Sequence, residues 1–133
     1  MNTKDPCSAE LHPEALQGIR LFNERHYFEA HEALEAAWRA ETESIRDLYR
    51  GILQAAVVYL HITRNNYWGA VKVYGRSQKW LNGWPDCCRG INVKKLRADL
   101  DKVMAEVEHL GPQRLSSFDL TLLKQIESEH GPA

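Results

Sequence analysis

The stretch from Leu48 to Arg64 constrains the fold more than any other part of the chain. On a helical wheel at about 100° per residue, its apolar side chains cover most of the circumference. A helix that is apolar nearly all round belongs in the middle of a bundle, with neighbours on several sides. One narrow stripe of it is polar and contains Arg50, Gln54 and His61. This stripe must face either water through a gap or polar partners inside the bundle.

Helical patterns also occupy the sequence on both sides of this stretch. The predicted helices run from Pro13 to about Glu24, from Tyr27 to about Ala40, through the central stretch, from Tyr67 to about Leu81, and from an Asn92 cap to Gly111. A last short helix is expected after Ser116 or Ser117. No segment alternates with a period of two over a strand's length, so no sheet is expected.

The first and third corners between helices repeat each other. Tyr27-Phe28-x-Ala30 matches Tyr67-Trp68-x-Ala70 at an offset of forty residues. Two copies are too few for a solenoid and instead predict two similar helical hairpins. The expected fold is all-α: a compact bundle of five to six helices with two similar antiparallel hairpins. It forms a single domain over residues 1–133, with its core at about 13–110 and with loose ends at 1–12 and 127–133.

Composition excludes several classes of partner. The 133 residues carry a formal net charge of -1, so no excess of basic side chains favours nucleic acid. No apolar run reaches the roughly 18 uncharged residues of a membrane span, and the N-terminus lacks the apolar core of a signal peptide. We therefore expect a cytoplasmic protein without nucleic-acid or membrane partners. The aromatic edge formed by Trp80 and Trp84 is compatible with a homodimer.

The cysteines fit a reducing location. Cys7 lies near the N-terminus, while Cys87 and Cys88 are adjacent in an irregular stretch. An odd number of cysteines without a Cys-x-x-Cys motif indicates neither a disulfide framework nor a zinc site. Reduced thiols with no assigned role are the expectation.

The second helix places two titratable groups within its apolar arc. That arc is defined by Tyr27, Phe28, Leu34 and Trp38. His31 and Glu35 fall inside it, one turn apart on the same side. Buried groups of this kind are costly unless they are paired. The nearest donors and acceptors are those of the polar stripe on the following helix.

Several motifs, taken in order, resemble the domain-of-unknown-function 309 family. They are Phe22-Asn23, Tyr27-Phe28-Glu29-Ala30-His31-Glu32-x-Leu34-Glu35-x-x-Trp38-Arg39, Tyr49-x-Gly51-Ile52-x-Gln54, Tyr59-x-His61 and Asn66-x-x-Gly69-Ala70. The resemblance covers about residues 16–81 and implies a small domain of about five helices with no assigned activity. The family often has glycine at the two corners where this chain has Arg25 and Asn65.

Three interpretations of the polar residues remain open. They form a structural network that fixes helix register, a pocket for a ligand or partner, or a metal site. The candidate residues for the network or the pocket are His31, Glu35, Gln54, His61, Arg50 and Trp38. The metal alternative is a metal-dependent hydrolase in which His31, Glu35 and His61 bind a divalent ion and leave a position for water. We favour a binding or scaffolding module, for which the sequence identifies no cofactor and no ligand.

Overall fold

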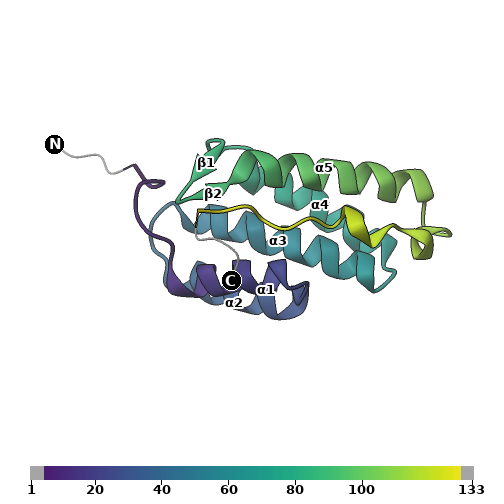
Figure 1. The fold of residues 1–133 in the computed structure, drawn as a ribbon, viewed down its shortest axis with the longest axis horizontal. Coiled ribbons are helices and arrows are strands. Elements are labelled where there is room, and N and C mark those ends of the chain that lie inside the picture. The colour runs from purple at the N-terminus through teal and green to yellow at the C-terminus, as the bar shows by residue number, and fades with distance from the viewer. Residues whose placement is uncertain (1–4, 130–133) are drawn as a thin grey trace.

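The computed structural model describes residues 5–129, and within them the chain is mainly helical (Figure 1). The helices are α1 (Pro13–Asn23), α2 (Tyr27–Ala40), α3 (Arg46–Thr63), α4 (Tyr67–Leu81) and α5 (Val93–Leu110). Two short strands, β1 (Cys87–Cys88) and β2 (Ile91–Asn92), precede α5, and two 3-10 turns, η1 (Leu115–Ser117) and η2 (Leu120–Leu122), follow it. The predicted all-α class is confirmed.

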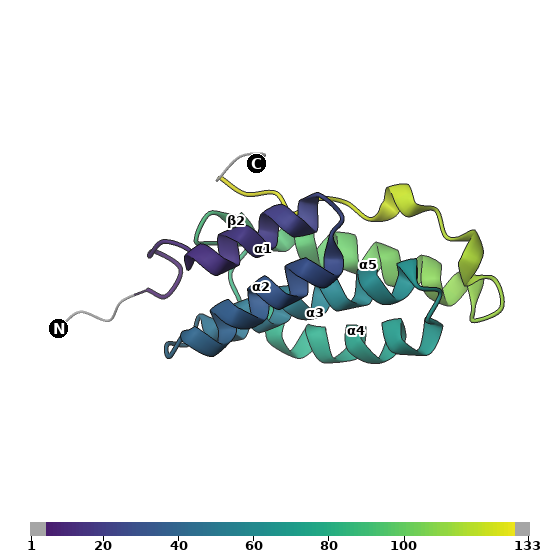
Figure 2. The same cartoon turned by 90° about the horizontal axis from the view of Figure 1, so that it is seen from below.

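Helix α3 is the centre of the bundle, as its apolar circumference predicts. It packs against α2 on one side and α4 on the other (Figure 2). Its buried residues are Leu48, Tyr49, Gly51, Ile52, Ala55, Ala56, Val58, Tyr59 and Ile62. The approach to α4 is close at Gly51, where a Cβ would lie 2.7 Å from Leu81 Cδ2. None of the helices in the described range is long and apolar enough to cross a membrane.

The two predicted hairpins have the same corner. Arg25 and Asn65, which are equivalent at the offset of forty, both take left-handed backbone conformations, with φ of 66° and 57°. In each corner the next amide donates to a carbonyl five residues earlier, which closes the helix end in the Schellman pattern. These bonds are His26 N–H to Leu21 O at 2.9 Å and Asn66 N–H to His61 O at 2.8 Å. The side chain of Arg25 donates from Nη1 to the Leu120 carbonyl, at 3.1 Å.

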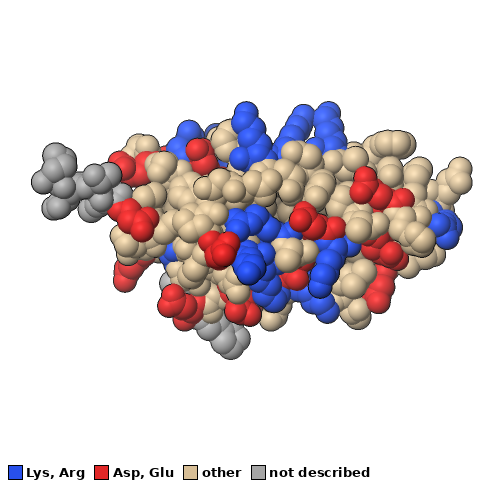
Figure 3. All heavy atoms as spheres, turned by 90° about the horizontal axis from the view of Figure 1, so that it is seen from above, with Lys and Arg blue, Asp and Glu red and all other residues tan. Residues whose placement is uncertain are grey.

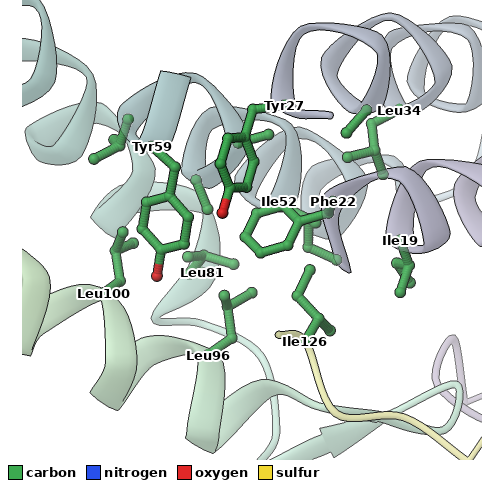
Figure 4. Packing of buried hydrophobic residues seen from close by; sticks show 14 of the residues in the cluster. Ile19, Phe22, Tyr27, Leu34, Ile52, Tyr59, Leu81, Leu96, Leu100 and Ile126 are labelled. Carbon is green, nitrogen blue, oxygen red and sulfur yellow. The ribbon is translucent and has the colours of Figure 1, made fainter. Parts of the chain in front are cut away.

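An aromatic group fills the core between the hairpins and α5. Phe22, Tyr27 and Tyr59 contact one another with ring centroids 5.2–5.5 Å apart (Figure 4). The side chains of Leu96 and Leu100 cover this group from α5. Edge-to-face and tilted pairs of this kind add stabilisation beyond the area they bury.

The buried face of α2 differs from the predicted arc. Tyr27, Ala30, Leu34 and Ala37 are buried, whereas Phe28 is 43% exposed. The reason is the close approach of α1, whose Gly18 leaves room for Leu34: a Cβ there would lie 2.6 Å from Leu34 Cγ. The glycine on α1 therefore receives Leu34 of α2, and the α2 face that includes Leu34 and Ala30 is buried in place of the one that includes Phe28.

In the described residues, the short C-terminal helix that we expected after Ser116 or Ser117 is reduced to the single 3-10 turn η2. After η2 the chain is extended and runs back along α5 towards β2 (Figure 1). There Asn92 N–H donates to Glu127 O at 2.9 Å, and Glu129 N–H donates to Gly90 O at 2.8 Å. The expectation of a loose end is thus wrong for residues 127–129, while residues 130–133 lie outside the described range.

A small sheet is present where none was expected. Strands β1 and β2 pair antiparallel around Arg89 and Gly90, which have φ of 48° and 79°. Positive φ at both turn residues is the geometry of the tight hairpin turn that suits the twist of the strands. Strands of two residues are too short to show an alternating pattern, so this hairpin left no periodic signal in the sequence.

The N-terminal segment is attached to this hairpin. Cys7 and Cys88 form a disulfide, so the interpretation of all three cysteines as reduced thiols is wrong, and Cys87 alone is free and exposed. Arg89 donates to the carbonyl of Pro6 at 2.6 Å and to the hydroxyl of Tyr49 at 3.2 Å. Residues 5–12 are therefore not loose, and residues 1–4 lie outside the described range.

Candidate functional site

The polar stripe of α3 meets a tryptophan from each neighbouring helix. The guanidinium carbon of Arg50 lies 5.1 Å from the ring centroid of Trp38 on α2 and 4.4 Å from that of Trp80 on α4. Arg46, one turn earlier on α3, lies 5.1 Å from the Trp38 ring, and Lys79 Nζ lies 5.0 Å from the Trp80 ring. All four distances are within the range of cation–π attraction. We call these five residues the cation–aromatic cluster.

Helix direction explains why cations gather here. Trp38 lies in the last turn of α2 and Trp80 in the last turn of α4, whereas Arg46 and Arg50 lie in the first two turns of α3. Because α3 runs antiparallel to both neighbours, its start lies beside their C-terminal ends. Those ends carry unpaired carbonyls and a partial negative charge, which stabilises nearby cations.

The cluster contains donors without matching acceptors. The ion pairs among residues 5–129 are Glu35–Arg39, Asp99–Lys95 and Asp86–Arg97. None of them involves Arg46, Arg50 or Lys79. In addition, Trp38 Nε1 and Arg46 Nε are buried, and neither has a hydrogen-bond partner within the part of the chain that the structure describes. Stacked cations with no carboxylate beside them are suited to an anionic group from outside the domain.

Glu35 forms its ion pair with a residue outside the cation–aromatic cluster. Its carboxylate lies 3.7 Å from Arg39 on the same helix, and its side chain is 38% exposed. The prediction that Glu35 is buried and requires a donor from α3 is therefore wrong. Exposed pairs four residues apart contribute only a few tenths of a kcal/mol, about 0.3–0.5.

His61 supports a helix cap. Asn66 Oδ1 accepts the Gly69 N–H at 3.0 Å, so its amide nitrogen faces His61 Nδ1 at 3.1 Å and must donate to it. The imidazole is then neutral, with its proton on Nε2. Burial, together with the charge of Arg64, lowers the pKa of His61 from its ordinary value, which agrees with this neutral form.

The remaining candidates make no bond with one another in the described part of the chain. His31 lies beside the Phe28 ring at a centroid distance of 5.9 Å, and its Nδ1 is buried without a partner among the described atoms, as is Gln54 Oε1. No hydrogen bond or ion pair found in residues 5–129 joins any two of His31, Glu35, Gln54 and His61. The predicted common network is therefore not formed.

The metal alternative gains no geometric support. Over residues 5–129 the structure contains no group of three or more His, Cys, Asp or Glu side chains that is arranged to hold a metal ion. His31, Glu35 and His61 thus do not form a ligand set in this arrangement, and their roles as metal ligands stay a prediction.

Comparison with known proteins supports the resemblance seen in the sequence. Residues 15–73 match the sequence model of a family described as Domain of unknown function (DUF309). Over these residues the chain is similar to the DUF309 family. An uncharacterized protein of Aquifex aeolicus (strain VF5) is 32% identical over 108 residues, which make up 80% of this chain and 32% of the relative. The chain therefore spans about a third of the length of that relative.

The DUF309 match divides the cation–aromatic cluster. Trp38, Arg46 and Arg50 lie inside the matched residues, whereas Lys79 and Trp80 follow them on α4. The sequence had singled out Trp38 and Arg50 as candidate site residues and Trp80 as part of an aromatic edge, but not Arg46 or Lys79. The spacing of four between Arg46 and Arg50 was the available signal, because it places both on one face of a helix.

Proposed function

We propose that this domain is a binding module that recognises an acidic segment of a protein partner at the cation–aromatic cluster. The observation that carries the proposal is the guanidinium of Arg50 between two tryptophan rings, with no carboxylate of the described residues paired to it. A stacked guanidinium keeps its N–H groups in the plane between the rings, where they can pair with a carboxylate through two parallel bonds.

The composition of the cluster also supports a protein partner. Tryptophan and arginine are the residues most enriched among those that dominate binding energy at protein interfaces. The Aquifex relative is about three times as long as the stretch it shares with this chain, so the domain occurs as one part of a larger protein. A small helical module in a longer chain suits a role in binding or scaffolding.

Location and self-association stay predictions. The cytoplasmic location was expected from the lack of a signal peptide and of a membrane span, and reduced cysteines were expected to fit it. The Cys7–Cys88 disulfide bears on that location because disulfides persist mainly in oxidising compartments. A homodimer through the aromatic edge would use Trp80, which here stacks on Arg50, and Trp84, which is half-buried against the core. A dimer and an acidic partner would therefore compete for part of the same surface.

The proposal is tested with a fluorescently labelled decapeptide of glutamate and glycine, and with a matched peptide of glutamine and glycine. We expect the acidic peptide to bind and the neutral one not to bind. Arg50→Gln should weaken binding roughly tenfold or more, the size of one buried charge-assisted contact. The matched control is Lys72→Gln, which removes an equal charge from an exposed position of α4.

The outcomes separate specific from general attraction. Loss of binding in Arg50→Gln alone supports the proposal, and Arg50→Lys should restore it only in part because an ammonium group lacks the planar fork. Equal weakening by Arg50→Gln and Lys72→Gln would show attraction by overall charge and would refute the site. Circular dichroism and the unfolding temperature of each variant establish that the comparison is made between folded proteins.

A further inference from the structure

A cavity lies on a different part of the molecule from the cation–aromatic cluster. It has a volume of about 590 Å³ and lies between the α1–α2 corner, the first turn of α5 and the extended segment that follows η2. Small-molecule sites commonly measure about 300–1,000 Å³. No local pattern in the chain indicates this cavity, because its walls come from three distant segments.

The floor of the cavity is aromatic. Phe22 and Tyr27 line it, and both belong to the buried core with exposed fractions of 1% and 3% (Figure 4). Ile126, which is also buried, adds an aliphatic surface from the extended segment. A ligand that enters this cavity therefore meets the edge of the hydrophobic core.

The rim of the cavity is cationic. Arg25, Lys95 and Lys124 line it together with one carboxylate, that of Glu127, so the formal charge of the lining is 3 − 1 = +2. Asp99 lies 2.6 Å from Lys95 and offsets part of that charge. Lys124 has no ion pair with a carboxylate in residues 5–129. Figure 3 shows that basic side chains gather near the middle of one long face of the molecule, the face on which α5 lies.

The outer wall is fixed by one side chain. Asn23 pairs with Ile126 as a strand would: its Nδ2 donates to the Ile126 carbonyl at 3.0 Å, and its Oδ1 accepts the Ile126 N–H at 2.7 Å. Gln125 Nε2 adds a bond to the Asn23 carbonyl at 3.2 Å. The cavity is therefore walled by a segment with specific bonds and is not a gap beside a free end.

We infer that this cavity is a binding site for a small carboxylate with an apolar body, such as a medium-chain or aromatic carboxylic acid. The apolar body packs against the small parts of Phe22 and Tyr27 that face the cavity, and the carboxylate pairs with the basic rim, chiefly with Lys124. An apolar floor with few polar groups at its edge is the usual composition of small-molecule sites. The site is independent of the cation–aromatic cluster and does not rest on the function proposed for it.

The test uses octanoate as the probe and octanamide, its neutral analogue, as the control. Amide signals of the full-length protein are followed by nuclear magnetic resonance during titration. Octanoate should shift the signals of residues 22–27 and 121–128, and octanamide should bind at least about threefold more weakly. Lys124→Gln should raise the dissociation constant of octanoate about two- to fivefold, the effect of one solvent-exposed charge pair.

Two matched variants complete the design. Lys102→Gln removes an equal charge from an exposed position of α5 outside the cavity and should leave octanoate binding unchanged. Arg50→Gln should also leave it unchanged, which separates this site from the one on α3. Equal binding of octanoate and octanamide, shifts outside the cavity residues, or equal effects of Lys124→Gln and Lys102→Gln would each overturn the inference.

Discussion

Removal of the Cys7–Cys88 disulfide should lower the free energy of unfolding by a large, measurable amount. It joins residues separated by 81 positions, so it closes most of the chain into one loop. In the chain-entropy description, closing a loop of this length lowers the entropy of the unfolded state and so stabilises the folded state by about 4.5 kcal/mol at 25 °C. The measured stabilisation by a disulfide is typically about 2–4 kcal/mol. We expect Cys7→Ser to lower the free energy of unfolding by about 2–4 kcal/mol. With an unfolding entropy of about 2.1 cal/mol/K per residue, the melting temperature should fall by about 7–14 °C.

The choice of residue and control matters for this measurement. Cys7 is half-buried, whereas Cys88 is only 1% exposed, so Cys88→Ser would add the cost of burying a hydroxyl group. Cys87→Ser removes the exposed free thiol and is the matched control, with no expected change. Urea unfolding is measured for both variants and the unchanged protein under non-reducing conditions. Intact mass before and after reduction shows whether two hydrogens are gained.

Two results would contradict this reasoning. One is a Cys7→Ser protein whose unfolding free energy lies within about 0.5 kcal/mol of the Cys87→Ser control, the range of ordinary surface substitutions. The other is a protein without substitutions whose mass stays the same on reduction, because this would show that the Cys7–Cys88 disulfide had not formed. A reductant should lower the stability of the unchanged protein and leave that of Cys7→Ser unaltered.

Further predictions concern packing, pH and capping. Gly51→Ala should destabilise the fold by about 1–3 kcal/mol, because the new Cβ meets Leu81 at 2.7 Å, whereas Gly75→Ala, in open space on α4, should stabilise it by up to about 1 kcal/mol in the same urea assay. Because folding lowers the pKa of His61, the unfolded chain binds the proton more tightly; stability should therefore decrease as the pH falls below about 6.5, and His61→Gln should flatten that slope in unfolding measurements at pH 5–8. Asn92→Ala removes the α5 cap and should cost about 1 kcal/mol by urea unfolding.

Much of the fold was predictable because its signals are local. The corner at Asn65 is marked by a residue type that tolerates the left-handed conformation. Arg25 occupies the equivalent position in the repeat, forty residues earlier, and has the same conformation. The start and end of α5 are marked by Asn92 and Gly111 in the same way. Each of these features depends on a few neighbouring residues, which is why the sequence was sufficient to place the helices.

The features that were missed depend on pairing between distant segments. The disulfide, the strand contacts of residues 127–129 and the cavity beside Asn23 each join positions far apart in the chain. The spacing of cysteines does not determine which of them pair, and an extended segment without a periodic pattern resembles an irregular tail. The wheel of α2 was misleading for a related reason, because it ranks residues by hydrophobicity and contains no information on Gly18 of α1, which makes room for Leu34.

The position of Arg50 beside the two tryptophans, in contrast, follows from the number of residues that separate each of them from the intervening loop. Trp38 and Arg50 are each six residues from Ser44, in the loop between α2 and α3, and Trp80 and Arg50 are each fifteen residues from Asn65, in the next corner. Residues equidistant from a tight turn between antiparallel helices lie side by side, so both contacts of Arg50 were available from the sequence once the loops were located. The absence of a paired carboxylate was not available, because it depends on where every acidic side chain in the fold is directed. Glu35 illustrates this: it shares α2 with Trp38, yet its carboxylate pairs with Arg39 on the same helix. The stacking is thus a consequence of local geometry, whereas the unpaired charge that makes the cluster a candidate site is a property of the whole fold.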